Sequence, residues 1–441
     1  MGVPEFTTNP DVGIVKEPNK ENPLDKYIAL PPLARWKALI LENGVRFDNP
    51  RLFNTYPDIT LYKVKKRRLK PVAKDLTVYD ESKDPSLIPA ELVIRHAQNA
   101  SIVKLGYRED SPISIGIDGN DIVLYDDKSH QVIPLGAELV ERYKALDHKM
   151  PISVDPDQHT VNDVIDVVGL DRLSVITFDG CWNWNKGTPC RFCDLNPKNT
   201  DFDSVKAMTN TLREYGQDID EWWDNSKNGY LKALKYGFRY LLDHEDIGPH
   251  RHLLVMSGNL PKSDKTWDIA QTVVDNLNQV EPVANFDNYL NICPHPDIEH
   301  LKRAKEAGIN QIQYNLEVVG EDMFRQMCPG KLDYNVFRSR LLEAVEVMGF
   351  GHVRSNFVLG LQPVDQLIEG VAALAENGVV ADYSIFQPKR GTPLEKHPSP
   401  TMDEIVYFTT QLVKIYKYYK FQGIYCNVSS RSSIINECLT T

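Results

Sequence analysis

The chain has 441 residues, of which 42% are hydrophobic and 25% are charged, the balance of an ordinary globular protein. This length is too great for one small domain and leaves room for a barrel-sized core and an additional module. The net charge of −11 argues against general nucleic-acid binding. No apolar run reaches the 18 or so residues that a membrane-spanning helix needs, so none is expected.

The cysteines and the N-terminus indicate a compartment. Residues 1–23 contain no apolar signal core. The seven cysteines are an odd number and are clustered, which does not suit a disulfide framework. We therefore expect a reducing cytoplasmic compartment and thiols that serve a metal or a reaction. A basic run, KVKKRRLKPVAK at 63–74, is interpreted as a solvated connector, with a contact for an anionic partner as the alternative.

The first part of the chain reads as an α+β module at residues 1–165. Apolar and polar residues alternate over 99–135 between turn signals that include Gly119-Asn120, which predicts an antiparallel meander or a pair of hairpins. Helical patterns at 30–43 and 139–146 flank these strands.

From residue 173 onward, short apolar runs alternate with longer amphipathic segments. Such alternation indicates βαβ units and a parallel sheet. Six units predict a partial (β/α)6 TIM-like barrel at 166–398, followed by a C-terminal helix and tail at 399–441 that pack on it. Chemistry in such folds takes place at the carboxyl ends of the strands. The six runs are 173–178, 252–258, 289–293, 309–317, 352–360 and 380–388.

Three cysteines follow the first of these strands within CWNWNKGTPCRFC, at Cys181, Cys190 and Cys193. A structural zinc site wants four nitrogen or sulfur ligands, and the candidates for a fourth, His159 and His252, are distant in sequence. Three thiolates instead suit a [4Fe–4S] cluster with one iron left open for a ligand. We favour the cluster, while a zinc site and unrelated buried thiols remain alternatives.

This triad resembles the radical S-adenosylmethionine (SAM) superfamily, although the usual CxxxCxxC spacing is lengthened to eight residues in the first gap. The resemblance implies a [4Fe–4S] cluster and SAM as cofactors, with Phe192 beside the adenine. Later strand ends support it. Ser257, Gly258 and Asn259 stand where the superfamily has a Gly-rich motif that binds the SAM amino group, although its third residue is often acidic and an ordinary turn is the alternative.

The fourth strand resembles those of biotin synthase, lipoyl synthase and their relatives. Asn315 and Glu317 in NLE share one strand face because they are two residues apart, and the resemblance places them at the SAM ribose and methionine portion. A strand-end salt bridge is the alternative. Lys331 or Arg325 is expected at the methionine carboxylate, and Gly360 close to the adenine. The segment GTPLE at 391–395 matches the end of the sixth strand in this branch.

The resemblance implies an oxygen-sensitive enzyme that reductively cleaves SAM to a 5′-deoxyadenosyl radical and abstracts hydrogen from a small molecule. An electron donor such as flavodoxin or ferredoxin is implied. Two alternatives remain: modification of RNA or a peptide, and a zinc-stabilised binding protein. The residues assign no catalytic side chain.

The residues of the lengthened loop and the four other cysteines each have more than one interpretation. Trp182, Trp184 and Lys186 lie in the lengthened cysteine loop and are weighed as a pocket wall or as loop packing. Four further cysteines match the number for an auxiliary cluster, but buried inert thiols are favoured, with hydrogen donation by Cys293 or Cys328 as an alternative. These four are Cys293, Cys328, Cys426 and Cys438. The N-terminal module is expected to cap the barrel mouth.

Overall fold

The computed structural model describes 24–47, 61–63, 87–108, 110–119, 121–128, 131–133, 135–140, 143–169, 172–178, 180–193, 219–244, 252–389, 392–423 and 430–439. The basic run from residue 64 onward, Cys426 and Gly391 lie outside the described residues. Within the described part of the chain, no helix has the length and apolar character needed to cross a membrane.

The N-terminal module is a helix packed on a mostly antiparallel sheet in the order β1-β6-β7-β9-β4-β5, with β8 paired to β7. Within the predicted range 99–135, antiparallel pairing is confirmed for β6–β7 and β7–β8, whereas β5 pairs with β4, which lies before that range. The β6–β7 hairpin turns at Gly119, whose φ of +62° suits a residue without a Cβ. The elements are η1 (Asp25–Tyr27), α1 (Pro32–Asn43), β1 (Arg46–Phe47), β4 (Glu91–His96), β5 (Asn99–Lys104), β6 (Ile113–Asp118), β7 (Asp121–Asp126), β8 (Gln131–Val132) and β9 (Gly136–Leu139), besides a separate pair, β2 (Leu61–Lys63) and β3 (Leu87–Pro89).

The helix predicted at 139–146 is wrong. Leu139 ends strand β9 and pairs with Leu92 of β4, and only a 3-10 turn, η3 (Lys144–Asp147), follows among the described residues. The apolar pattern at 139–146 is short enough to suit either a helix or a strand, and pairing of Leu139 with a neighbouring strand favoured the strand.

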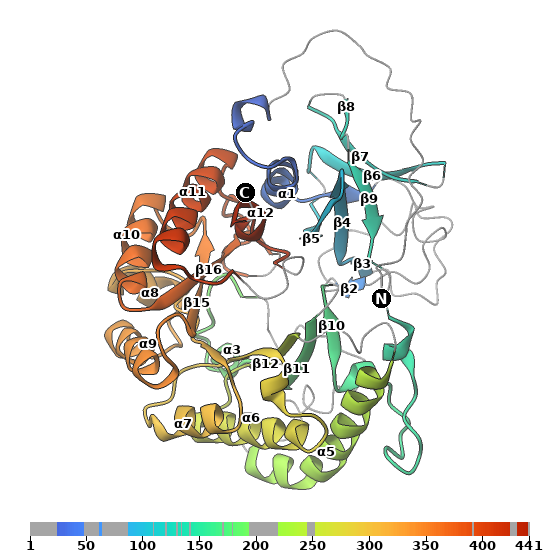
Figure 1. Cartoon of the computed structure of the whole chain (residues 1–441), viewed down its shortest axis with the longest axis vertical. Helices are drawn as coiled ribbons and strands as arrows, with labels where there is room; N and C mark the ends of the chain where they lie inside the picture. Colours follow the sequence, from blue (N-terminus) through green and yellow to red (C-terminus); the bar gives the residue numbers. More distant parts are fainter. Residues whose placement is uncertain are drawn as a thin grey trace.

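The second part is a curled sheet of seven strands in the order β10-β11-β12-β13-β14-β15-β16. Strand β10 is antiparallel to β11, and all the later pairs are parallel. Helices cover the outer side of the curled sheet (Figure 1). This confirms the predicted α/β class with a partial (β/α)6 barrel. The strands are β10 (Asp166–Val168), β11 (Arg172–Phe178), β12 (His252–Ser257), β13 (Asp287–Asn291), β14 (Gln311–Gln313), β15 (Val353–Leu359) and β16 (Val379–Ile385).

Alternation of strand and helix follows from the sequence pattern, since each helix presents an apolar stripe to a sheet that is buried on both faces. The helices are α3 (Trp182–Asn185), α5 (Ile219–Asp243), α6 (Ser263–Asn278), α7 (Glu299–Glu306), α8 (Glu321–Met327), α9 (Tyr334–Met348), α10 (Val364–Ala375), α11 (Met402–Tyr419) and α12 (Ile435–Leu439), with 3-10 turns η4 (Val161–Asp163) and η5 (Val283–Asn285).

The two parts share one apolar core, which extends from helix α1 through the barrel to helix α12. Polar contacts reinforce the junction. The buried Lys37 ammonium donates to Ser430 O at 2.5 Å and to Glu437 Oε1 at 2.7 Å, and Lys104 N donates to Arg431 O at 2.9 Å. Burial lowers the pKa of Lys37, against the opposing effect of Glu437. The segment 430–439 therefore joins the N-terminal module to the barrel.

Candidate functional site

The cysteine loop leaves the carboxyl end of β11 and passes directly over the end of β12. Gly258 N donates to Phe178 O at 2.9 Å, and Trp182 N donates to Asn259 O at 2.8 Å. A Cβ added to Gly258 would lie 1.5 Å from Gly180 O. Gly258 is therefore needed so that the backbone just before Cys181 can cross β12. The space beside Gly258 is therefore occupied by the protein's own backbone.

Gly258→Ala is expected to lower the free energy of unfolding by about 3 kcal/mol, because the added Cβ meets backbone that must move. Gly229→Ala in α5 is the matched control, since a Cβ there meets nothing within 4 Å, and alanine in a helix is favoured over glycine by about 1 kcal/mol. Urea unfolding of both variants measures the difference. Equal stability of Gly258→Ala and the parent would contradict the predicted clash between the added Cβ and the backbone at Gly180.

A second chain segment supports the loop from the side of α8. Arg191 N donates to Met327 O at 2.9 Å, and a Cβ on Gly330 would lie 2.3 Å from Thr188 O. Cys190 therefore lies against Cys328, and the hydrogen bond between the two thiols, together with burial, raises the pKa of Cys190 well above its usual value. Burial also raises the pKa of Cys181. A metal bound by these thiols would displace their protons.

The spacing of the three thiols bears on the zinc alternative. Among the described residues, every group of three possible ligand atoms within 4.8 Å of one another consists of Asp and His residues. Thiolates on one zinc, each about 2.3 Å from the metal, lie closer together than that limit. Cys181, Cys190 and Cys193 therefore do not form a preassembled zinc site, whereas thiolates on separate irons of a cluster lie farther apart.

Glu317 and Lys331 form a buried ion pair beside the cysteine loop. Lys331 Nζ donates to Glu317 Oε1 at 3.0 Å and to Asn315 O at 2.5 Å. The side chains of Lys331 and Glu317 are 8% and 12% exposed. Burial alone would lower the pKa of Lys331, but Glu317 and the nearby thiols outweigh it and hold the pKa well above its usual value. The ammonium is therefore charged at neutral pH.

The backbone of Glu317 is in the left-handed region, with φ of +72°. This conformation is uncommon for a residue with a side chain, and it costs free energy that the surrounding structure must supply. Hydrogen bonds to β15 hold it: Glu317 N donates to Asn356 O at 3.0 Å and Val358 N donates to Glu317 O at 2.8 Å. A buried acidic side chain on a strained backbone is typical of functional sites.

A cavity of about 640 Å³ lies on the inner side of the curled sheet. Phe192, Asn315 and Glu317 all line it. The predicted common strand face of Asn315 and Glu317 is wrong, because β14 ends at Gln313 and the chain bends before Glu317; the bend directs both residues to the cavity. The Asn315 amide also links strands: its Nδ2 donates to Asn291 Oδ1 at 3.2 Å, and its Oδ1 accepts from Asn356 N at 3.1 Å. Both ends of the Asn315 amide are therefore engaged within the protein.

The N-terminal module contributes to the wall of the larger cavity. Glu91 of β4 and Lys104 of β5 line it, together with Arg431 from the C-terminal segment. Arg431 and the buried Glu91 form an ion pair across this junction. No pattern in the sequence indicated these contacts, because the partners are more than three hundred residues apart.

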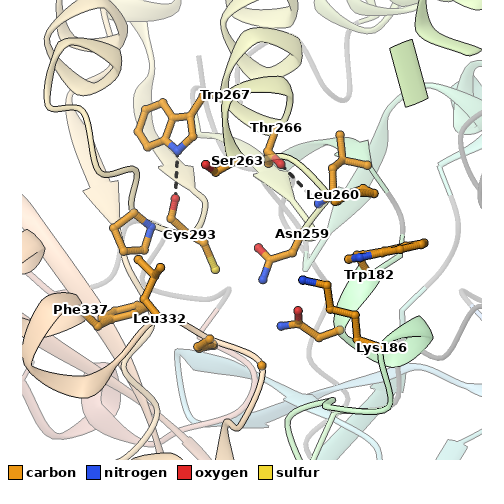
Figure 2. Close-up of a pocket in the computed structure, with 15 residues that line it drawn as sticks. Trp182, Lys186, Asn259, Leu260, Ser263, Thr266, Trp267, Cys293, Leu332 and Phe337 are labelled. Carbon is orange, nitrogen blue, oxygen red and sulfur yellow. Dashed lines mark hydrogen bonds between the residues drawn. The ribbon is translucent and has the colours of Figure 1, made fainter. Parts of the chain in front are cut away.

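Lys331 of the ion pair also lines a second, smaller cavity of about 210 Å³. Figure 2 shows this smaller cavity. It is bounded by the cysteine loop, the carboxyl ends of β12 and β13, and the segment 330–332. Asn259 and Lys331 line it, and Figure 2 shows the Cys293 thiol directed into it. Since Glu317 lines the larger cavity and Lys331 the smaller, their ion pair marks the boundary between the two.

Three further residues expected to contact a cofactor, Ser257, Gly360 and Arg325, line neither the larger nor the smaller cavity. Ser257 Oγ donates to Gly258 O at 2.8 Å. Gly360 has φ of +105°, and the space that its Cβ would occupy is filled by Pro400, at 2.7 Å. Gly360 thus has a packing role, and its approach to a cofactor stays a prediction. Arg325, the alternative to Lys331, is largely exposed and pairs with Asp322 at 2.5 Å.

Asp264, His295 and His300 come together at the end of β13, and the sequence reasoning did not single them out. His295 Nδ1 accepts from Asp297 N at 2.9 Å, and His300 Nδ1 accepts from Arg303 Nη2 at 2.6 Å. Each neutral ring then carries its proton on Nε2. Both Nε2 atoms face Asp264 Oδ1, at 2.7 and 3.7 Å. This group is a hydrogen-bonded cluster and lacks free nitrogen lone pairs for a metal.

No protein-family model matches the chain. It is 22% identical over 319 residues to the bacteriochlorophyllide c C-7(1)-hydroxylase of Chlorobaculum limnaeum, which covers 70% of this chain and 73% of the relative. It is 25% identical over 130 residues to an uncharacterized protein of Methanocaldococcus jannaschii, covering 29% of this chain and 34% of that protein.

Three solved structures show partial likeness. The [FeFe]-hydrogenase maturase HydG from Carboxydothermus hydrogenoformans gives a TM-score of 0.36 at 17% identity, covering 56% of this chain and 51% of that one. Methylornithine synthase gives 0.36 at 14%, covering 57% and 64%. Coproporphyrinogen III oxidase from Escherichia coli, described as a radical SAM enzyme, gives 0.30 at 11%, covering 38% and 41%. The chain thus spans between 41% and 64% of these structures' lengths.

Proposed function

We propose that this protein is a radical SAM enzyme. It holds a [4Fe–4S] cluster through Cys181, Cys190 and Cys193, cleaves SAM reductively and abstracts hydrogen from a small-molecule substrate. The observation that carries the proposal is the position of the triad: one loop at the carboxyl edge of a six-stranded parallel sheet. The sequence relationship to a hydroxylase over 70% of the chain supports an enzymatic role.

The residues present fit the cluster and SAM. The donor set is three thiols with no nitrogen or carboxylate among them, which suits iron–sulfur ligation. Within the loop, the Nδ2 atom of Asn183 is buried and has no hydrogen-bond partner in the described part of the chain, so this donor could bind a ligand acceptor. When bound, the reduced cluster supplies the electron that breaks the sulfonium C–S bond of SAM and yields the 5′-deoxyadenosyl radical.

The chain's own groups would position SAM across the two cavities. Phe192 presents an aromatic wall to the larger cavity, suited to an adenine face. The carboxylate of Glu317 offers acceptors for ribose hydroxyls, and its ion pair with Lys331 holds both side chains in place. The Lys331 ammonium and the Asn259 side chain line the smaller cavity, where the amino-acid end would lie.

The walls of the larger cavity favour a small substrate. The N-terminal module and the C-terminal segment supply part of this wall, so three parts of the chain surround the proposed reacting centre. Such walls limit the access of water to a radical reaction. RNA or a peptide would need an open groove at this position, and the basic run proposed as its contact lies outside the described residues.

The test is anaerobic iron–sulfur reconstitution of the full chain, followed by reduction with SAM and assay of 5′-deoxyadenosine. We expect about four irons per chain, SAM cleavage by the parent, and loss of both iron and cleavage in Cys190→Ala. Cys438→Ala is the matched control because Cys438 is buried in α12, and it should retain both. Bound zinc without iron and sulfide would overturn the proposal.

A further inference from the structure

Two lysines, Lys186 and Lys331, line the smaller cavity of a protein whose net charge is −11. Lys331 is paired with Glu317, and no Asp or Glu is among the described residues that line this cavity. Ser263, the first residue of the 16-residue helix α6, also lines it, and no side chain caps the N-terminus of that helix. Uncapped helix N-termini carry partial positive charge and free N–H groups. The cavity is therefore suited to an anion.

Asn183 gives an independent indication of a ligand. It lines the same cavity, is 5% exposed, and its Nδ2 has no hydrogen-bond partner within the described residues. A buried amide donor left without an acceptor destabilises the folded chain. Folded proteins rarely accept that cost without a partner such as a ligand oxygen.

The lengthened cysteine loop is what brings these groups together. Its first residues after Cys181 fold into the single helical turn α3, and Lys186 N closes that turn on Trp182 O at 3.1 Å. Asn183 and Lys186 are three residues apart, so they lie on one side of the turn. Figure 2 shows the Lys186 side chain reaching toward Asn259, with the Cys293 thiol across from them. The usual shorter spacing between the first two cysteines has no room for this turn.

We propose that Asn183 and Lys186 bind the carboxylate of the amino-acid end of SAM, an inference that rests on the proposed function above. The Lys186 ammonium and the Asn183 amide supply two donors to the carboxylate oxygens, and α6 adds the field of its N-terminus. The lengthened loop is a cofactor-positioning element as well as a cluster-binding one.

The test compares two ligands that differ only in the amino-acid end. S-adenosylhomocysteine carries the carboxylate, and 5′-methylthioadenosine lacks it. Binding of each to the reconstituted full chain is measured by anaerobic titration calorimetry, which requires no turnover. Lys186→Met should weaken S-adenosylhomocysteine binding roughly ten-fold, the value of one charge-assisted hydrogen bond, and change 5′-methylthioadenosine binding less than about two-fold.

Asn183→Asp is the second variant, because it keeps the shape of the side chain but places a negative charge against the carboxylate. It should weaken S-adenosylhomocysteine binding at least as much. Lys262→Met is the matched control, since this neighbouring lysine pairs with Asp220 at 2.6 Å and does not line the cavity.

Each outcome is decisive. Unchanged S-adenosylhomocysteine binding in both variants would overturn the assignment while leaving the proposed function intact if the parent still cleaves SAM. Equal weakening of both ligands would assign Asn183 and Lys186 to loop packing and would also overturn it. Failure of the reconstituted parent to bind either ligand would instead count against the proposed function.

Discussion

Removal of residues 1–165 is expected to leave a barrel that does not fold to a soluble protein able to retain iron. The N-terminal module and the barrel share one apolar core, in which α1 packs against α11 and α12. Truncation would expose this apolar surface and leave the buried Glu437 without the ammonium of Lys37, 2.7 Å away. The total stability of a domain is only about 5–15 kcal/mol, so the loss of this core and ion pair is expected to prevent folding.

The measurement is the soluble yield and iron content of 166–441 after anaerobic reconstitution, compared with the full chain. Co-expression of residues 1–165 as a separate chain is the control, because the missing surface is then supplied and part of the iron content should return. Soluble 166–441 with full iron occupancy would show that the module is independent of the barrel, and the shared core would then not be required for cluster binding.

Arg354→Met is expected to lower the free energy of unfolding by about 3–5 kcal/mol, the usual cost of leaving a buried charge without its partner. Arg354 and Asp382 lie on adjacent strands inside the barrel and are almost completely buried. Arg354 donates to both Asp382 carboxylate oxygens, from Nε at 2.7 Å and from Nη2 at 2.5 Å. Tyr416 OH donates to the same carboxylate at 3.2 Å.

The double variant Arg354→Met, Asp382→Leu is the internal control. It removes both charges together, so it should recover part of the lost stability. Asp403→Asn tests the opposite case, because its ion pair with Lys26 is exposed on both sides and should contribute less than about 1 kcal/mol. Urea unfolding measures all three variants. A decrease in the free energy of unfolding of less than 1 kcal/mol for Arg354→Met would show that other groups stabilise the buried carboxylate of Asp382.

The sequence was most informative where chemistry or periodicity is local. The cysteine triad, the alternation of strands and helices and the turn at Gly119-Asn120 each depend on neighbouring residues, and all were readable before the structure. The expected strand at 309–317 proved shorter, because β14 spans only Gln311–Gln313 and the chain then bends to place Glu317 with positive φ. This backbone conformation is set by contacts with β15, which periodicity does not encode.

The sequence by itself determined the α/β class, the parallel order of units and the loop that bears Cys181, Cys190 and Cys193, since these follow from local pattern and residue chemistry. Tertiary structure alone decided which groups meet across the chain. It placed Gly180 against Gly258, Lys331 against Glu317, and the N-terminal strands beside the C-terminal segment in the wall of the larger cavity. Packing and ion pairing between distant segments carry no local pattern, so only the folded chain reveals them.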